Sequence, residues 1–85
     1  MNPALAIESS FKVTSSLHAS VWKVSCSPGD VIAFASDVLL ILEAMKTEIP
    51  ITAGEDNVGR IVYRLGKNVK KGATVRPGDV LVILL

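Results

Sequence analysis

Short apolar segments alternate with clusters of turn-forming residues along most of the chain. The clusters include Pro28-Gly29-Asp30, Gly66-Lys67-Asn68 and Pro77-Gly78-Asp79, and the segments between them are rich in β-branched and large apolar side chains. Short strands separated by such turns are typical of an all-β barrel or sandwich. The apolar positions of 38–42 are consecutive rather than three and four apart, which favours a strand over a helix there. We predict strands over 11–14, 21–26, 38–43, 49–52, 58–63 and 80–85.

The sequence also contains an internal repeat, in which the order of turns and apolar segments in the first half recurs in the second half. In the first half a turn and short strand (28–32) are followed by the apolar run 37–42, and in the second half 71–75 are followed by 77–84. Two similar halves can each cover the apolar face that the other exposes. The sequence therefore predicts an all-β fold, a flattened barrel-like sandwich of two antiparallel sheets with a pseudo-twofold internal repeat.

The two copies of the repeat differ after their long apolar strand. The first copy continues through Glu43-Ala44-Met45-Lys46-Thr47-Glu48 and returns as a new strand, whereas the second reaches Leu85. Segment 43–48 is therefore predicted as an exposed turn at one end of the domain, held by paired strands on both sides. A lysine at such a tip is suited to covalent attachment, because Schiff-base and general-base chemistry needs a desolvated amine.

Composition limits the classes of function. With 85 residues the chain forms one small domain, and 49% hydrophobic residues exclude a disordered polar tail. A net charge of +1 does not require a nucleic-acid partner, and the cluster 67–71 is interpreted as a solvated turn. We see no Ser-His-acid set, metal cluster or phosphate-binding glycine loop, and therefore expect no active site of its own.

The single cysteine and the N-terminal residues bear on location. Cys26 has no second cysteine with which to form a disulfide, and this single cysteine and the single histidine, His18, are too few ligands for a metal site. The N-terminus has no signal-peptide pattern, and no apolar run approaches the roughly 20 residues of a membrane-spanning helix. We therefore expect a cytoplasmic location without a membrane partner or a metal.

The string Glu43-Ala44-Met45-Lys46 resembles the modification motif of the biotinyl (biotin carboxyl carrier) domain family. The resemblance covers residues 11–85, with residues 1–10 left over as a linker remnant or sequence foreign to the domain. It implies the biotinyl/lipoyl type of fold, with biotin joined to Lys46 by an amide bond. It also implies that Glu43, Ala44, Met45, Thr47 and Glu48 shape the turn or are read by a biotin protein ligase.

Two further segments narrow the resemblance. Thr47-Glu48-Ile49-Pro50-Ile51 and Trp22-Lys23-Val24 are similar to the carrier domains of the urea carboxylase and urea amidolyase subfamily. That resemblance implies a piece of a larger biotin-dependent carboxylase, a ligase as a whole. Its carrier would take carboxybiotin on Lys46 from a biotin carboxylase to a carboxyltransferase site, both in the same polypeptide.

Departures from the family pattern leave alternatives open. Ser15-Ser16 and Ala53-Gly54 stand where the family commonly has Ala-Pro, and Thr47 replaces the commoner Met after the lysine. The same fold could serve as a lipoyl carrier domain, although Met45 and Thr47 favour biotin, because lipoyl domains commonly have an acidic residue before the lysine and Ala after it. A small β-barrel interaction module with an unmodified lysine is the third interpretation.

Overall fold

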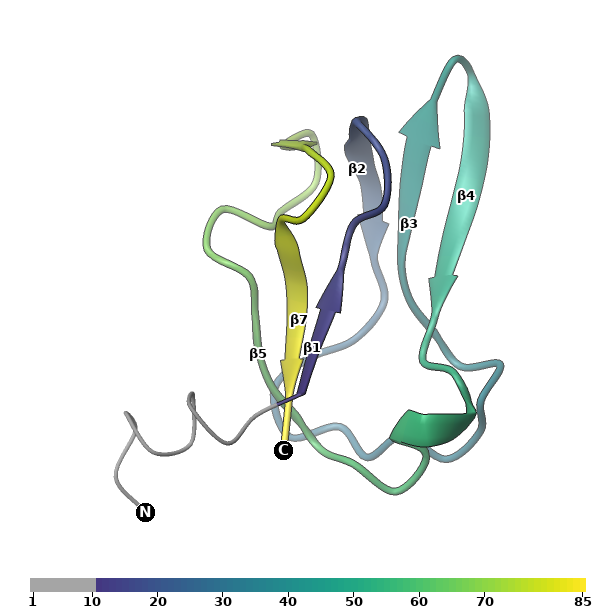
Figure 1. The fold of residues 1–85 in the computed structure, drawn as a ribbon, viewed down its shortest axis with the longest axis vertical. Helices are drawn as coiled ribbons and strands as arrows, with labels where there is room; N and C mark the ends of the chain where they lie inside the picture. Colours follow the sequence, from purple (N-terminus) through teal and green to yellow (C-terminus); the bar gives the residue numbers. More distant parts are fainter. Residues whose placement is uncertain (1–10) are drawn as a thin grey trace.

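Two antiparallel sheets make up residues 11–85, the part of the chain that the computed structural model describes (Figure 1). One sheet has the order β1-β7-β5 and the other the order β4-β3-β2-β6. Segment 1–10, predicted as a linker remnant or foreign sequence, lies outside the described residues. None of the helical structure between residues 11 and 85 is long and apolar enough to cross a membrane. The elements are β1 (Phe11–Thr14), β2 (Ala19–Val24), β3 (Val38–Ala44), β4 (Thr47–Thr52), the 3-10 turn η1 (Glu55–Asn57), β5 (Val62–Leu65), β6 (Thr74–Val75) and β7 (Val80–Leu84).

The central strands of the two sheets supply the middle of a single apolar core. Leu40 and Leu42 of β3 and Leu81 and Leu84 of β7 are each 0% exposed. Consecutive residues are buried on both strands, Leu39 and Leu40 on β3 and residues 81–84 on β7, so both faces of each strand are covered there. This explains why the two most apolar segments of the sequence sit in equivalent places.

Backbone hydrogen bonds reproduce the sequence repeat as a pseudo-twofold arrangement. β3 lies between β4 and β2, just as β7 lies between β1 and β5. The N–H of Gly29 donates to the carbonyl oxygen of Val62 at 2.8 Å, and the N–H of Gly72 donates to that of Val21 at 2.8 Å. Each half thus docks its first turn on a strand of the other half. The predicted sandwich with an internal repeat is confirmed.

An aspartate locks the turn before each central strand. Asp37 Oδ2 accepts hydrogen bonds from the backbone N–H groups of Ala33 and Phe34, at 2.9 and 3.1 Å. In the other half Asp79 Oδ2 accepts one from the N–H of Arg76 at 2.9 Å. Aspartate favours such turns because its side chain satisfies nearby backbone donors. The two carboxylates therefore fix where β3 and β7 begin.

Two predicted strands are displaced. The segment predicted as 21–26 is paired over 19–24, and the chain leaves the sheet before Cys26, which is buried in the following loop. The prediction for 58–63 is wrong in its first part, because η1 precedes it and Gly59 has a φ of 87°. The paired strand there begins only at Val62, after a single bridge between Val31 and Ile61.

Candidate functional site

The candidate site is the tip of the β3–β4 hairpin. β3 ends at Ala44 and β4 begins at Thr47, so only Met45 and Lys46 form the turn. Their φ angles are 51° and 62°. A two-residue hairpin loop with positive φ at both positions is a type I′ turn, whose twist matches that of the flanking strands.

The predicted turn over 43–48 is therefore too long. Glu43 pairs with Glu48, and Ala44 pairs with Thr47, so all four residues belong to the strand ladder. The tight turn allows pairing to continue up to the residues next to it. Lys46 is consequently held by a hairpin ordered almost to its end, and not by a loose loop.

The backbone of the turn is in a conformation that L-residues avoid. The left-handed region disfavours a residue with a Cβ by roughly 1–2 kcal/mol. Five glycines take positive φ in the described chain, whereas the tip uses Met45 and Lys46. Residues held in such conformations cluster at binding and recognition sites, where the surrounding structure maintains them. Here the β3–β4 ladder maintains them.

Exposure at the tip is high. Met45 is 97% exposed, and Lys46 is exposed as well. Ala44, by contrast, is half-buried and packs against the core. The lysine therefore has a fixed Cα at the base and a free side chain in water, which leaves its amine accessible to a large enzyme.

Two carboxylates flank the lysine from neighbouring strands. Glu43 and Glu48 are register partners, so they lie directly opposite each other. Like charges in that arrangement destabilise a hairpin. The carbonyl oxygen of Glu43 also accepts a hydrogen bond of 3.4 Å from Ser20 Oγ on β2. The site thus combines one amine with a carboxylate pair at the end of the sheet.

Sequence reasoning found Lys46 but missed the opposition of Glu43 and Glu48. Placing 38–44 against 47–52 with a two-residue turn would have revealed this pair. The usual signal for that turn is Asn-Gly or Asp-Gly, and Met45-Lys46 does not carry it. The remaining predicted residues, Ala44 and Thr47, close the turn from both sides.

The other chemistry-bearing groups stand apart from the tip. His18 is exposed in the β1–β2 loop. Burial, with Asp30 nearby, raises the pKa of the Cys26 thiol. No group of three His, Cys, Asp or Glu side chains in the described part of the chain could hold a metal ion.

The family model for biotin-requiring enzymes, the biotin/lipoyl attachment family, matches residues 10–84. The chain belongs to this family. It is 39% identical over 72 residues to the biotinylated protein TB7.3 homolog of Mycobacterium leprae, a match covering 85% of this chain and 93% of that protein. It is 38% identical over 72 residues to the biotin/lipoyl attachment protein of Bacillus subtilis, covering 85% and 90%.

Larger proteins contain a similar domain. A putative urea carboxylase of Emericella nidulans is 38% identical over 60 residues, which cover 66% of this chain and 5% of that protein. The crystal structure of Kluyveromyces lactis urea carboxylase matches with a TM-score of 0.74 and 29% identity, over 89% of this chain and 6% of that one. A single-chain, multi-domain long-chain acyl-CoA carboxylase matches with a TM-score of 0.71 and 25% identity, over 88% and 7%.

These matches define the class of domain. The chain spans nearly all of the two small relatives and less than a tenth of each carboxylase. It is a biotinyl carrier domain of the kind that carboxylases contain, homologous to the carrier domain of urea carboxylase. The resemblance seen in Glu43-Ala44-Met45-Lys46 is confirmed at the level of family and fold.

Proposed function

We propose that Lys46 Nζ is the attachment point of biotin, and that the domain carries a carboxyl group between two active sites of a biotin-dependent carboxylase. One observation carries this proposal. In a chain of the biotin-requiring family, Lys46 occupies an exposed, ordered two-residue turn beside Met45, which is 97% exposed. No other described lysine combines that turn with the family motif.

The residues present fit an amide-linked group. In the attachment step the Lys46 amine attacks the carboxyl carbon of an adenylate-activated acyl group, AMP leaves, and two ammonium protons are released. The amide removes the lysine charge while keeping its four-carbon stem as part of a longer arm. Nothing in the described structure covers the amine, so the step needs no rearrangement of the hairpin.

Attached biotin supplies a ureido ring that takes up and gives up a carboxyl group, while the protein supplies position and travel. The fold is suited to movement of Lys46 between two active sites. Phe11 pairs with Leu84, so both ends of the described residues lie at the end of the domain opposite the hairpin tip (Figure 1). Lys46 is therefore free to enter a partner's active site while the far end is held. Tethering keeps the carrier concentrated near both sites.

Urea carboxylase is the parent enzyme that we propose. The Emericella and Kluyveromyces matches support it, with urea as acceptor and allophanate as product. The partners would be a biotin protein ligase, and a biotin carboxylase and a carboxyltransferase in the same polypeptide. The chemistry would take place in those partners, in the cytoplasm, and the carrier would contribute no catalytic residue.

A lipoyl cargo is the second candidate. The similarity to a biotin/lipoyl attachment protein of Bacillus subtilis is the observation that favours it. The residues around the lysine argue against it, because Met45 replaces the acidic residue and Thr47 the alanine that lipoyl domains commonly have. Biotin is therefore the cargo that we propose.

Intact mass after co-expression with a biotin protein ligase tests the proposal. Lys46→Arg keeps the charge but removes the acyl acceptor, and Lys67→Arg is the matched control at another exposed lysine. We expect one biotin adduct on the parent chain and on Lys67→Arg, and none on Lys46→Arg. An adduct only with a lipoate ligase would support the second candidate. No adduct with either ligase would leave an unmodified interaction module and overturn the proposal.

The acceptor is tested separately. A urea carboxylase and a long-chain acyl-CoA carboxylase, each with its own carrier domain deleted, are supplied with the biotinylated chain, and acceptor-dependent ATP hydrolysis is measured in each. We expect the chain to restore activity to the urea carboxylase and not to the acyl-CoA carboxylase. The opposite preference would assign the carrier to an acyl-CoA carboxylase.

A further inference from the structure

Charge is divided unevenly along the chain. Residues 60–76 contain six Lys or Arg and no Asp or Glu, whereas residues 24–59 contain six Asp or Glu and a single cation, Lys46. The net charge of +1 conceals this separation. A surface of one sign attracts a partner of the other sign and raises its rate of encounter.

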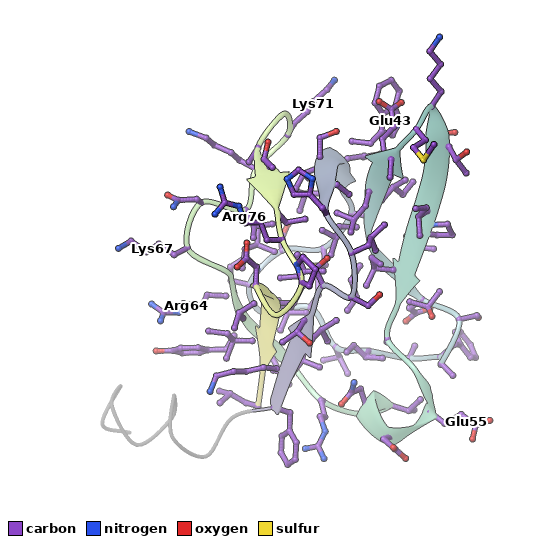
Figure 2. The ribbon with its side chains drawn as sticks, turned by 45° about the horizontal axis from the view of Figure 1, so that its top comes forward. Glu43, Glu55, Arg64, Lys67, Lys71 and Arg76 are labelled. Atoms are coloured by element: carbon purple, nitrogen blue, oxygen red, sulfur yellow. The ribbon has the colours of Figure 1, made fainter. Side chains whose placement is uncertain are left out.

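The fold gathers the cations on one side of the domain. We define the basic loop as residues 64–76. Its five cations are exposed, and they are Arg64, Lys67, Lys70, Lys71 and Arg76. Figure 2 shows four of them along one side, with Glu43 and Glu55 on the other. The cluster that sequence reasoning interpreted as a solvated turn is therefore part of a larger group of exposed cations on one side of the domain.

The basic loop lies at the same end of the domain as Lys46. Ser20 of β2 pairs with Thr74 on one side and with Glu43 on the other. Thr74 and Glu43 are thus about two strand spacings apart, or roughly 10 Å, and the hairpin tip continues beyond Glu43. One side of a typical interface covers about 800 Å², which corresponds to a patch roughly 30 Å across. A protein of that size bound at Lys46 would also reach the part of the basic loop that lies toward the same end of the domain as the hairpin tip (Figure 1).

The pseudo-symmetry shows that this charge is not required by the fold. The bonds of Gly29 and Gly72 make segment 21–33 the counterpart of the basic loop. That segment contains one cation, Lys23, and one anion, Asp30, whereas the basic loop contains five cations and no anion. The same backbone can therefore be built without the excess positive charge of the basic loop.

We propose that the basic loop docks on an acidic surface of the biotin protein ligase, beside the ligase site that receives Lys46. This inference rests on the proposed function. The ligase is the partner that meets the unmodified domain, in which the Lys46 ammonium adds to the cations of the loop. Forming the amide removes that charge, so the attraction weakens once modification is complete. The charges of the loop would therefore speed encounter, and loss of the Lys46 charge would favour release.

Two double variants with equal changes in net charge test the inference. Lys70→Glu/Lys71→Glu reverses charge within the basic loop, and Lys12→Glu/Lys23→Glu does so at exposed strand positions outside it. The kcat/KM for biotinylation is measured with a purified biotin protein ligase at 0.05 M and 0.5 M NaCl, and thermal unfolding of each variant is followed. At low salt we expect the loop variant to lose about tenfold or more, mainly through KM. The strand variant should stay within about twofold of the parent.

Salt separates electrostatic docking from a change in shape. At 0.5 M NaCl screening should bring the loop variant to within about threefold of the parent. Equal losses in both variants would mean that only net charge matters, and no loss in the loop variant would mean that the ligase does not touch the loop. A loss unaffected by salt would also contradict the inference. Failure of the parent chain to be biotinylated would instead overturn the proposed function.

Discussion

The β3–β4 hairpin and its pseudo-symmetric counterpart, the β7–β1 pair, are built alike and end differently. In each a buried central strand pairs antiparallel with an outer strand. Only the first pair is joined by a turn, and that turn holds Met45 and Lys46 at positive φ. At the other end Phe11 lies beside Leu84, where the chain enters and leaves the described domain. One fold thus places the exposed hairpin tip at one end and the two ends of the described chain at the other.

The comparison also shows where backbone strain is placed. The turns that dock the two halves use glycine at positive φ, as at Gly29 and Gly72, so they carry no steric penalty. The hairpin tip uses residues with side chains instead. The fold thus places glycine at positive φ in its docking turns and places residues with a Cβ there at the hairpin tip, as it does at Asn68.

The largest expected effect tests whether the two halves contribute equally to the core. Leu42 pairs with Val21, and Leu84 pairs with Val62, and both leucines are 0% exposed. Leu42→Ala and Leu84→Ala should each lower the free energy of unfolding by about 3–4 kcal/mol, because each leaves a cavity in a packed core. Urea denaturation measures both. A much smaller loss of stability for Leu84→Ala would show that the end of the domain near Phe11 and Leu84 is frayed, and that the two halves are symmetric only in appearance.

The next effect concerns the docking turns. Gly29 and Gly72 have φ angles of 95° and 89°, and a Cβ at either would find open space. Gly29→Ala and Gly72→Ala should each destabilise the domain by about 1–2 kcal/mol, through backbone conformation alone. Replacing the same glycines by Asn, which tolerates this region better, should cause a smaller loss. Equal losses for Ala and Asn would show that the turns fail for another reason.

Much of this architecture could be predicted from the sequence. The strand over 11–14 and the two apolar central strands are visible because turn residues bound short apolar runs. The repeat adds long-range information, since Asp37 and Asp79 precede equivalent strands. Lys46 stood out because it lies where the two copies of the repeat differ.

The features that escaped prediction depend on backbone geometry that the residues do not signal. Met45 and Lys46 are poor type I′ residues, so the length of the turn and the pairing of Glu43 with Glu48 were hidden. The late start of β5 results from η1 and Gly59, in a stretch whose apolar residues suggested a strand. The placement of the basic loop also needed the fold, because only the sheet order brings it toward the Lys46 end.

A third prediction exchanges the strained turn for a relaxed one. Met45→Asn/Lys46→Gly supplies the residues that a type I′ turn favours, and should stabilise the domain by about 1–2 kcal/mol. Met45→Asn alone should give about half of that gain and keep the lysine. Thermal unfolding and ligase assays are run in parallel. An unchanged or lower stability of the double variant would show that the tip is not strained.

A smaller effect is expected from the opposed carboxylates. Glu48→Lys turns the pair with Glu43 into one of opposite charge, and should stabilise the hairpin by about 0.5 kcal/mol. Thr52→Lys, an exposed position on the same strand paired with Val38, is the matched control and should change little. The gain should shrink in high salt, since both side chains reach water. An equal gain in the control would assign the effect to net charge.

The smallest expected effect concerns Cys26, where the two halves carry different residues at equivalent positions. The carbonyl oxygen of Ser27 accepts a hydrogen bond from the N–H three residues later, and that of Lys70 does the same, so the two residues are equivalent and Val69 is the counterpart of Cys26. The variant Cys26→Val should therefore change the stability of the domain little at pH 7. The raised pKa of the thiol means that the folded state keeps the proton longer than the unfolded state. Stability of the parent chain should therefore fall as pH rises above about 8.5, and Cys26→Val should lack that part of the fall. Urea denaturation at pH 7 and pH 10 measures the difference between the two chains. Parallel losses in both would mean that the thiol titrates alike in the folded and unfolded states.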